Sequence, residues 1–233
     1  EGHGPLGCLF DEVHEDDTLG QKNWEKAESA LFGAAVNRCL EKANLKPEDA
    51  RFLLGGDLLN QLAASCFACR DLGIPFLGLF GACSTMAESL AVGSMLLDGG
   101  SADRLVCAAS SHFCTAERQF RFPLELGTQR PPSAQWTVTG AGAVLLHEQD
   151  MAAGVYPAVT HVTVGKPIDF GVTDANNMGA AMAPAAAATI RQHFYDASRT
   201  VDDYDFIVTG DLGRVGSELL RELLKKEGAS LPE

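Results

Sequence analysis

The feature that most constrains the fold is an alternation of short apolar runs with helix-type patterns. The runs at residues 52–54 and 74–80 have the apolar character of strands buried on both faces. Between them and before them, apolar residues recur at intervals of three and four, as at Ala27, Leu31 and Ala35, which is typical of an amphipathic helix. Strands that alternate with helices predict an α/β fold with a mixed or parallel central sheet.

The pattern can be followed along the whole chain. It predicts helices over residues 23–43, 58–72, 183–195 and 215–227, and a further helix that opens at residues 81–83 and closes at Gly99. It predicts strands over residues 51–56, 74–80, 104–110, 155–164 and 205–209, and a strand over residues 136–147 that is interrupted at residues 140–143. Residues 111–135 are expected to form a polar loop. Because a strand–helix–strand–helix order occurs early and again late, we predict two halves, residues 1–150 and 151–233, of which the second is incomplete.

Composition excludes several classes of partner and site. The formal net charge of −13 argues against a nucleic-acid partner. The same charge repels a small anion at long range, so an anion site would have to be built from local hydrogen-bond donors. Seven cysteines without a framework of spacings indicate a reducing compartment and no disulfide scaffold. No apolar run approaches the roughly 20 residues that a membrane span requires. We therefore expect a soluble protein whose contact with a membrane, if any, is peripheral, with no metal centre and no cofactor.

The sharpest local motif is the run from Gly81 to Thr85, which joins a predicted strand to a predicted helix. A tight turn there would present the Cys83 side chain beside backbone N–H groups at a helix N-terminus. Such a position suits a nucleophilic thiol, and the same N–H groups could instead bind a carboxylate. The alternative is that Cys83 is one more small buried residue; the motif favours a site and leaves its chemistry open.

A nucleophilic cysteine also needs a base, and the histidine best placed in the sequence is His112, which follows the predicted strand 104–110. The other histidines lie in the acidic N-terminal segment, at a strand end, within a β-rich run or on a helix. A lone histidine after a strand serves equally well as a structural hydrogen-bonding group. His112 is thus either a pocket residue or part of the framework.

Three motifs carry a resemblance to a known superfamily. The Gly81–Ser84 turn is similar to the nucleophile turn of thiolases and β-ketoacyl synthases, residues 139–144 resemble the Gly-Ala-Gly-Ala strand of the ketoacyl synthase III branch, and residues 45–49 resemble a turn of the same proteins. The resemblance implies a thiolase-like fold of two duplicated halves in α-β-α-β-α layers. It also implies a homodimer, with Leu105–Ala109 as the candidate edge strand.

Longer blocks resemble one family within that superfamily. Residues 72–85, 131–140, 176–184 and 207–214 are similar to the stage V sporulation protein AD family. That family's role, in sporulation and spore germination, is to bind dipicolinic acid, with or without calcium, and to support its transport into the spore. The resemblance further implies peripheral association with the spore inner membrane after synthesis in the cytoplasm, and partners among other stage V sporulation proteins of a membrane channel complex.

The resemblance also bears on catalysis. Where condensing enzymes have a catalytic His and Asn, this chain has Gly210 and Gly213, so no condensing activity and no catalytic residue are expected. In this interpretation the pocket that serves as the active site in condensing enzymes would instead bind dipicolinic acid. The binding residues would be Cys83, Ser84, Thr85, His112, Trp136, Asn177 and Arg214. Two alternatives stay open: an acyltransferase or condensing-type enzyme with Cys83 as nucleophile, and a structural scaffold for a membrane transport complex.

Overall fold

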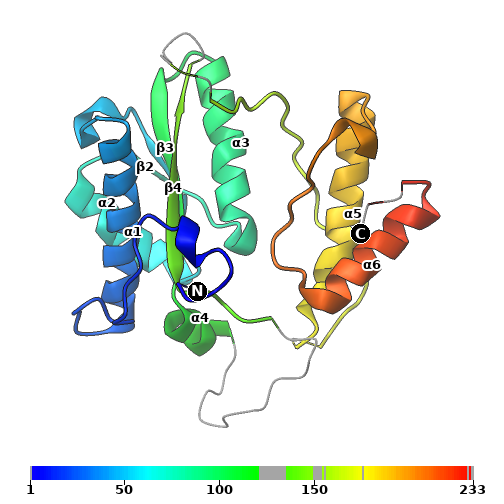
Figure 1. Cartoon of the computed structure of the whole chain (residues 1–233), viewed down its shortest axis with the longest axis horizontal. Coiled ribbons are helices and arrows are strands. Elements are labelled where there is room, and N and C mark those ends of the chain that lie inside the picture. The colour runs from blue at the N-terminus through cyan, green and yellow to red at the C-terminus, as the bar shows by residue number, and fades with distance from the viewer. Residues whose placement is uncertain are drawn as a thin grey trace. The chain divides into compact units, whose positions relative to one another are not determined.

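The computed structural model describes residues 2–120, 135–148, 154, 156–174, 176–229 and 231, which form two compact units. The first unit comprises Glu1–Leu126 with Thr137–Ala158, and the second comprises Gly127–Trp136 with Val159–Glu233. The predicted division near residue 150 remains a prediction. In chain order the elements of the first unit are α1 (Trp24–Lys42), β1 (Leu53–Gly56), α2 (Ala63–Leu72), β2 (Phe76–Gly78), α3 (Thr85–Asp98), β3 (Arg104–Ser111), α4 (Phe113–Phe120) and β4 (Gly140–His147), and those of the second are α5 (Met178–Ala197) and α6 (Gly213–Lys226) (Figure 1).

The first unit is built on a four-stranded sheet with the order β2-β1-β3-β4. Strand β1 pairs in parallel with β2 and with β3, while β4 runs antiparallel to β3 in a continuous ladder from Arg104↔His147 to Ser111↔Gly140. The expected interruption of this last strand at residues 140–143 is therefore wrong. So is the expectation that Leu105–Ala109 forms a free edge, because β3 is hydrogen-bonded on both sides; the edges of the described sheet are β2 and β4.

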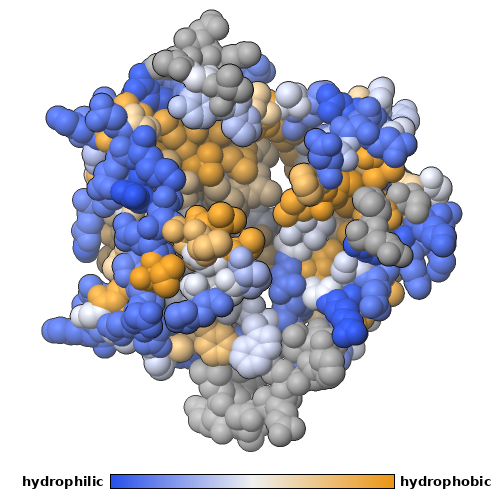
Figure 2. All heavy atoms as spheres, viewed as in Figure 1, coloured by the Kyte–Doolittle hydropathy of each residue, from blue (hydrophilic) through white to orange (hydrophobic). Residues whose placement is uncertain are grey.

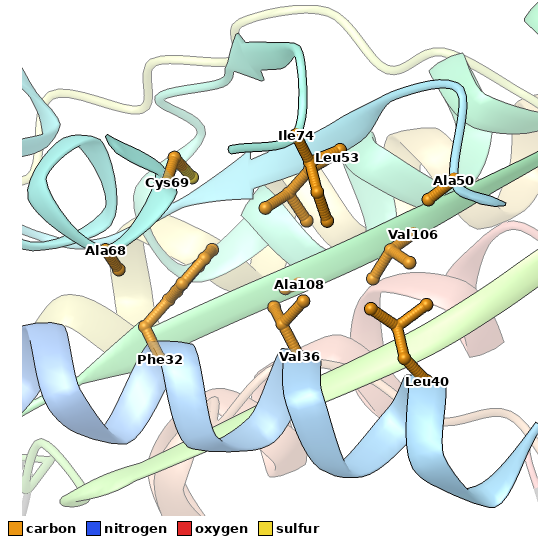
Figure 3. Packing of buried hydrophobic residues seen from close by; sticks show 10 residues of the cluster. All are labelled: Phe32, Val36, Leu40, Ala50, Leu53, Ala68, Cys69, Ile74, Val106 and Ala108. Carbon is orange, nitrogen blue, oxygen red and sulfur yellow. The ribbon is translucent and has the colours of Figure 1, made fainter. Parts of the chain in front are cut away.

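Helices cover both faces of this sheet. On one face α1 and α2 bury an apolar cluster in which Phe32, Val36 and Leu40 of α1 point toward Leu53 of β1 and Val106 of β3 (Figure 3). On the other face α3 packs against β1 and β3 and contributes to a second cluster. A sheet buried on both faces explains why its strands are uniformly apolar in sequence.

Local signals account for several element boundaries. Asn23 caps α1, because its side-chain oxygen accepts from the backbone N–H of Lys26 at 2.9 Å. Gly73 ends α2 with a left-handed φ of 70°. The expected loop 111–135 was wrong in its first part, where α4 forms; its buried face is Thr115, Ala116 and Glu117, which is too polar to be recognised as an apolar stripe.

The second unit consists of α5 packed on α6. Their N-terminal turns approach so closely that a Cβ built on Gly179 would lie 2.4 Å from the carbonyl oxygen of Leu212 and 2.9 Å from the backbone nitrogen of Gly216. Helix α5 begins at Met178 and not at residue 183, because Asn177 provides the cap; Pro184 consequently lies inside the helix and not in its first turn. None of the helices in the described ranges has the length and apolar character needed to cross a bilayer.

Two predicted strands of this unit are not formed. Residues 156–164 and 205–209 make no ladder with any described residue, and residue 155 lies outside the description. A strand needs a neighbour for its N–H and C=O groups, and the pattern alone does not provide one. Their apolar side chains stay exposed as a result: Val164 is 75%, Phe206 86% and Val208 89% accessible.

An apolar surface is also left on α3. This helix buries Thr85, Ser89 and Gly93 against the sheet, yet it is apolar around much of its circumference, and Met95 is 50% exposed. Figure 2 shows apolar side chains on this part of the surface. Helices that are apolar on all sides are usually covered on all sides. The buried stripe of small side chains explains how α3 approaches the sheet so closely.

Candidate functional site

The candidate site of the first unit lies where the parallel strands β1, β2 and β3 end. Asp57 follows β1, the Cys83 turn follows β2, and His112 follows β3. The carboxyl ends of parallel strands share one edge of a sheet, and this edge is where open α/β folds bind ligands. The topology therefore gathers one acid, one thiol and one imidazole on the same side of the sheet.

The Cys83 turn is sharply bent and exposes the thiol. Ala82 has a left-handed φ of 48°, residues Ala82–Ser84 form a short 3₁₀ turn, and Cys83 is exposed. Gly81 is closely surrounded, because a Cβ would lie 2.5 Å from Ser84 Oγ and 2.4 Å from Glu88 Oε2, so these side chains would have to move to admit one. The prediction of a tight turn that presents Cys83 is confirmed, whereas a binding role for Cys83 stays a prediction.

The hydrogen-bonding groups of the turn are largely occupied by the turn itself. The Ser84 hydroxyl and the Ser84 N–H both donate to the carbonyl of Gly81, at 2.8 Å and 2.9 Å, and the Thr85 N–H donates to the carbonyl of Ala82. The buried Thr85 hydroxyl accepts from the N–H of Gly81 at 3.1 Å. A ligand at this turn would thus meet the Cys83 side chain before the hydroxyls. Sequence reasoning missed Glu88, whose carboxylate lies against the turn one helical turn into α3.

His112 is fully buried and both of its ring nitrogens are engaged. Nδ1 lies 3.2 Å from the backbone nitrogen of Cys114, which can only donate, so Nδ1 accepts. Nε2 therefore carries the proton and donates to the carbonyl oxygen of Asp17 at 2.8 Å. Of the two roles that the sequence left open for His112, these contacts correspond to the one in which it is part of the framework. His112 could reach a ligand only after its bond to Asp17 opened.

A buried acidic network lies beneath His112. Glu28 of α1 is fully buried; its two carboxylate oxygens lie 2.7 Å from the Thr115 hydroxyl and 3.3 Å from the Ser110 hydroxyl. Asp57 is buried too and accepts from the N–H and hydroxyl of Ser65 at 2.7 Å and 2.6 Å. Burial, together with the nearby Asp57 charge, raises the pKa of Glu28 to about 7, although the bonds from Thr115 and Ser110 oppose the shift. Sequence analysis did not identify Glu28, because it belongs to no recognisable motif.

The other three predicted residues belong to the second unit. Asn177 caps α5, where its Oδ1 accepts from the N–H of Ala180 at 3.3 Å, and Arg214 lies in the first turn of α6, with its Nε 3.9 Å from Glu218 and its side chain 86% exposed. Trp136 is 61% exposed, and its neighbour Gln135 donates to the carbonyl of Asp211 at 3.0 Å. Asn177 and Arg214 thus lie at the paired N-termini of α5 and α6, and Trp136 follows a residue that contacts the start of α6.

The two glycines that the sequence resemblance aligned with a catalytic His and Asn lie in this same region. Gly210 is exposed and Gly213 has a left-handed φ of 62° at the start of α6. The side chain of Asp211 accepts from the N–H of Gly213 at 2.8 Å, which folds it back onto the helix start. Neither glycine offers a side chain for proton transfer.

A cavity that the sequence did not indicate lies elsewhere in the second unit. It has a volume of about 290 Å³ and is lined by His193, Tyr204 and Thr163 together with apolar residues. His193 Nε2 lies 2.7 Å from the Tyr204 hydroxyl and Nδ1 lies 2.9 Å from Thr163 Oγ1. Because these polar groups satisfy one another, the contacts fix α5 to its flanking segments and give no ligand preference.

Comparison with known proteins adds a family to this geometry. A family model described as Stage V sporulation protein AD matches residues 1–233. Stage V sporulation protein AD of Bacillus subtilis (strain 168) is 52% identical over 228 residues, which cover 98% of this chain and 66% of that protein. The chain thus spans just under two thirds of the length of the curated relative that it matches. The family resemblance seen in the sequence is confirmed.

Solved structures share the fold at low identity. A variant of OleA from Xanthomonas campestris superposes with a TM-score of 0.64 at 15% identity, over 93% of this chain and 71% of that one. The 3-oxoacyl-(acyl-carrier-protein) synthase III of Aquifex aeolicus VF5 superposes with a TM-score of 0.59 at 12% identity, over 87% and 66% of the two chains. The thiolase-like α/β fold predicted from the sequence is confirmed.

Proposed function

Because this chain belongs to the stage V sporulation protein AD family, we propose that it is a sporulation protein that binds dipicolinic acid without condensing activity. The ligand, pyridine-2,6-dicarboxylate, is flat, aromatic and dianionic. In this proposal the protein supports its uptake into the spore and its release on germination. Two observations support dipicolinic acid as the ligand: the resemblance of the sequence to that family, and the hydrogen-bond donors described above.

The observation that carries the proposal is the meeting of two helix N-termini in the second unit. The backbones of α5 and α6 approach each other at Gly179 and Gly216, so the positive ends of two helix dipoles converge. Arg214 stands in the first turn of one helix, and the amide nitrogen of Asn177, whose oxygen forms the cap, is at the start of the other. A protein with a net charge of −13 needs this kind of local donor set to bind a dianion.

The absence of condensing activity follows from the proton-transfer groups. Gly210 and Gly213 supply no imidazole and no amide at the positions where condensing enzymes carry their base. In the first unit, His112 already uses Nδ1 and Nε2 for backbone contacts. The proposal accordingly assigns no catalytic residue and no cofactor.

The second candidate function is an acyltransferase, and the exposed thiol favours it. Cys83 projects from a bent turn that has the position of a nucleophile in the superfamily. Incubation with a panel of acyl-CoA thioesters and intact-mass measurement tests this directly. A stable acyl adduct that Cys83→Ser abolishes would favour the enzyme; an unmodified mass would remove it.

Assembly and location belong to the proposal as well. We place the protein peripherally at the spore inner membrane, with other stage V sporulation proteins of a channel complex as partners, and we expect a homodimer. Since β3 is internal, the short edge strand β2 is the better candidate for pairing; Leu77 of β2 and Phe80 beyond it are 41% and 54% exposed. Leu77→Lys should therefore shift the sedimentation of a dimer toward the monomer.

The deciding experiment is isothermal titration with dipicolinate, with and without calcium, beside pyridine-3,5-dicarboxylate. Saturable binding of the 2,6 isomer alone would support the proposal. Arg214→Gln should weaken binding by about tenfold, since a hydrogen bond to a charged group contributes roughly 1.5–3 kcal/mol. Arg221→Gln, an exposed position farther along α6, is the matched control. Equal binding of both isomers, or no binding, would contradict a shaped dicarboxylate site.

A further inference from the structure

The buried Glu28 has a hydrogen-bonding problem that depends on its proton. The hydroxyl oxygen of Thr115 lies 2.7 Å from Glu28 Oε2 and 2.9 Å from the carbonyl oxygen of His112. A threonine hydroxyl carries one proton, and both neighbours are acceptors when Glu28 is ionised. One of these two close oxygen pairs would then have no proton between its members.

Protonation of Glu28 satisfies every group. The carboxylic O–H donates to Thr115 Oγ1, the Thr115 hydroxyl donates to the His112 carbonyl, and the other Glu28 oxygen still accepts from Ser110 at 3.3 Å. The chain of bonds then joins α1 to the end of β3 and the start of α4. Ionisation would turn the Thr115 hydroxyl toward Glu28 and leave the His112 carbonyl with its backbone donor, the N–H of Ala116.

The surroundings favour the neutral form. Glu28 and Asp57 are both fully buried, and a second buried charge of the same sign is unfavourable in a medium of low dielectric constant. Burial first, and then the charges of Asp57 and Glu25, raise the pKa of Glu28 to about 7. The elements that pack against α1 carry further ionisable groups: His112 with Cys114, Glu117 and Arg118 of α4, Cys66, Cys69, Arg70 and Asp71 of α2, Arg104 and Cys107 of β3, and His147 of β4. Arg118 is paired with Glu25 at 3.1 Å.

We propose that Glu28 is a proton switch of the junction between α1, the end of β3 and the start of α4, closed when Glu28 is protonated and open when it is ionised. Ionisation breaks the link from Thr115 to the His112 carbonyl and leaves a buried negative charge near the buried Asp57. Both effects act against the closed junction, so closing takes up a proton where Glu28 is ionised.

The size of the effect follows from the closed fraction. With half-protonation near pH 7, about nine tenths of Glu28 is protonated at about pH 6 and about one tenth at about pH 8, so the closed fraction should fall about tenfold between them. Glu28→Gln carries a neutral amide that donates to Thr115 and accepts from Ser110. This variant should keep the junction closed at both pH values.

Two measurements test the switch. In a carboxyl-carbon NMR titration of the ligand-free protein, Glu28 should titrate near pH 7, and the amide signals of residues 112–115 should shift with the same midpoint. Thr115→Val should abolish the coupled shift, and Thr115→Ser should restore it. Titration of Glu28 in the range of an ordinary glutamate, or amide signals that do not follow it, would overturn the switch.

The amide signals of the variants complete the test. Glu41→Gln, an exposed position on the same helix, is the matched control and should keep the shift of residues 112–115 between the two pH values. Amide shifts that persist in Glu28→Gln would overturn the assignment of the switch to Glu28.

Discussion

The two units use the same kinds of sequence pattern with different results. In the first, apolar runs become paired strands because each has a neighbour: β1 lies between β2 and β3, and helices bury both faces. In the second, residues 205–209 have an equally apolar pattern, yet Phe206 and Val208 remain almost fully exposed. A strand pattern thus specifies what a segment can pair with, and the presence of a partner decides whether a sheet forms.

The largest expected effect tests the core of the first unit. Phe32→Ala removes a fully buried ring from the cluster between α1 and the sheet, so it should lower the free energy of unfolding by about 3–5 kcal/mol. Phe206→Ala, at an 86% exposed position of the second unit, should change it by less than about 0.5 kcal/mol. Urea denaturation followed by circular dichroism measures both. A large cost at Phe206 would mean that this segment is covered after all.

The next effect concerns pH. Burial raises the folded-state pKa of Glu28 from 4.5 to about 7, so the folded protein binds more protons than the unfolded chain between these values. The contribution of Glu28 to stability is fully present below about pH 4.5 and is lost as the pH rises through 7, a decrease of about 3 kcal/mol in total. Unfolding free energies at several pH values should show this slope in the parent protein and in Glu41→Gln, an exposed position of the same helix. A slope that survives in Glu28→Gln would assign it to another group.

A smaller effect is expected where the two helices of the second unit meet. A Cβ on Gly179 would lie 2.4 Å from the Leu212 carbonyl oxygen, so Gly179→Ala must move α5 away from α6. We expect a loss of about 1–3 kcal/mol, as for other overpacked sites. Thermal unfolding of that variant, with Ala185→Gly in the same helix as a comparison for helix propensity alone, measures it. Unchanged stability would show that the helix contact is loose.

The smallest effect has the opposite sign and lies in the first unit. Gly33 is in the middle of α1, and a Cβ there would meet no atom within 4 Å. Gly33→Ala should therefore raise the free energy of unfolding by roughly 0.5–1 kcal/mol, because alanine loses less backbone entropy in a helix. Differential scanning calorimetry would record this as a higher melting temperature. A lower one would indicate a hidden constraint on α1.

Most of the first unit could be predicted from the sequence. The strands around Leu53 and Leu105 and the helix around Phe32 carry periodic apolar residues with clear stop signals, and the Gly81–Thr85 turn is visible from its composition. Helix α4 could not be found, since its buried face consists of Thr115, Ala116 and Glu117. Periodicity of apolar residues does not register a helix that buries polar groups.

The site was predictable only in part for a related reason. Cys83 belongs to a local motif, and the structure places it just before a helix, as expected. Asn177 also lies at a helix start, although that helix was expected to begin only at residue 183. The engagement of His112 depends on the carbonyl of Asp17, 95 residues away in the chain, and the importance of Glu28 depends on Thr115, 87 residues away. Such long-range contacts determine how a side chain is used, and a single sequence does not encode them in any local pattern.

The backbone contact between Gly179 and Gly216 has a consequence for how sequences of this family can vary. Two main chains at this distance leave no volume for a methyl group on either side. Neither glycine can therefore be replaced unless the other helix moves. A lineage that gained a side chain at one of them would have to reposition an entire helix, and with it the residues at its cap. Among relatives, a substitution at either glycine should therefore occur only together with other changes along α5 and α6. Such a substitution would identify relatives in which the two helix ends are arranged differently and bind a different ligand.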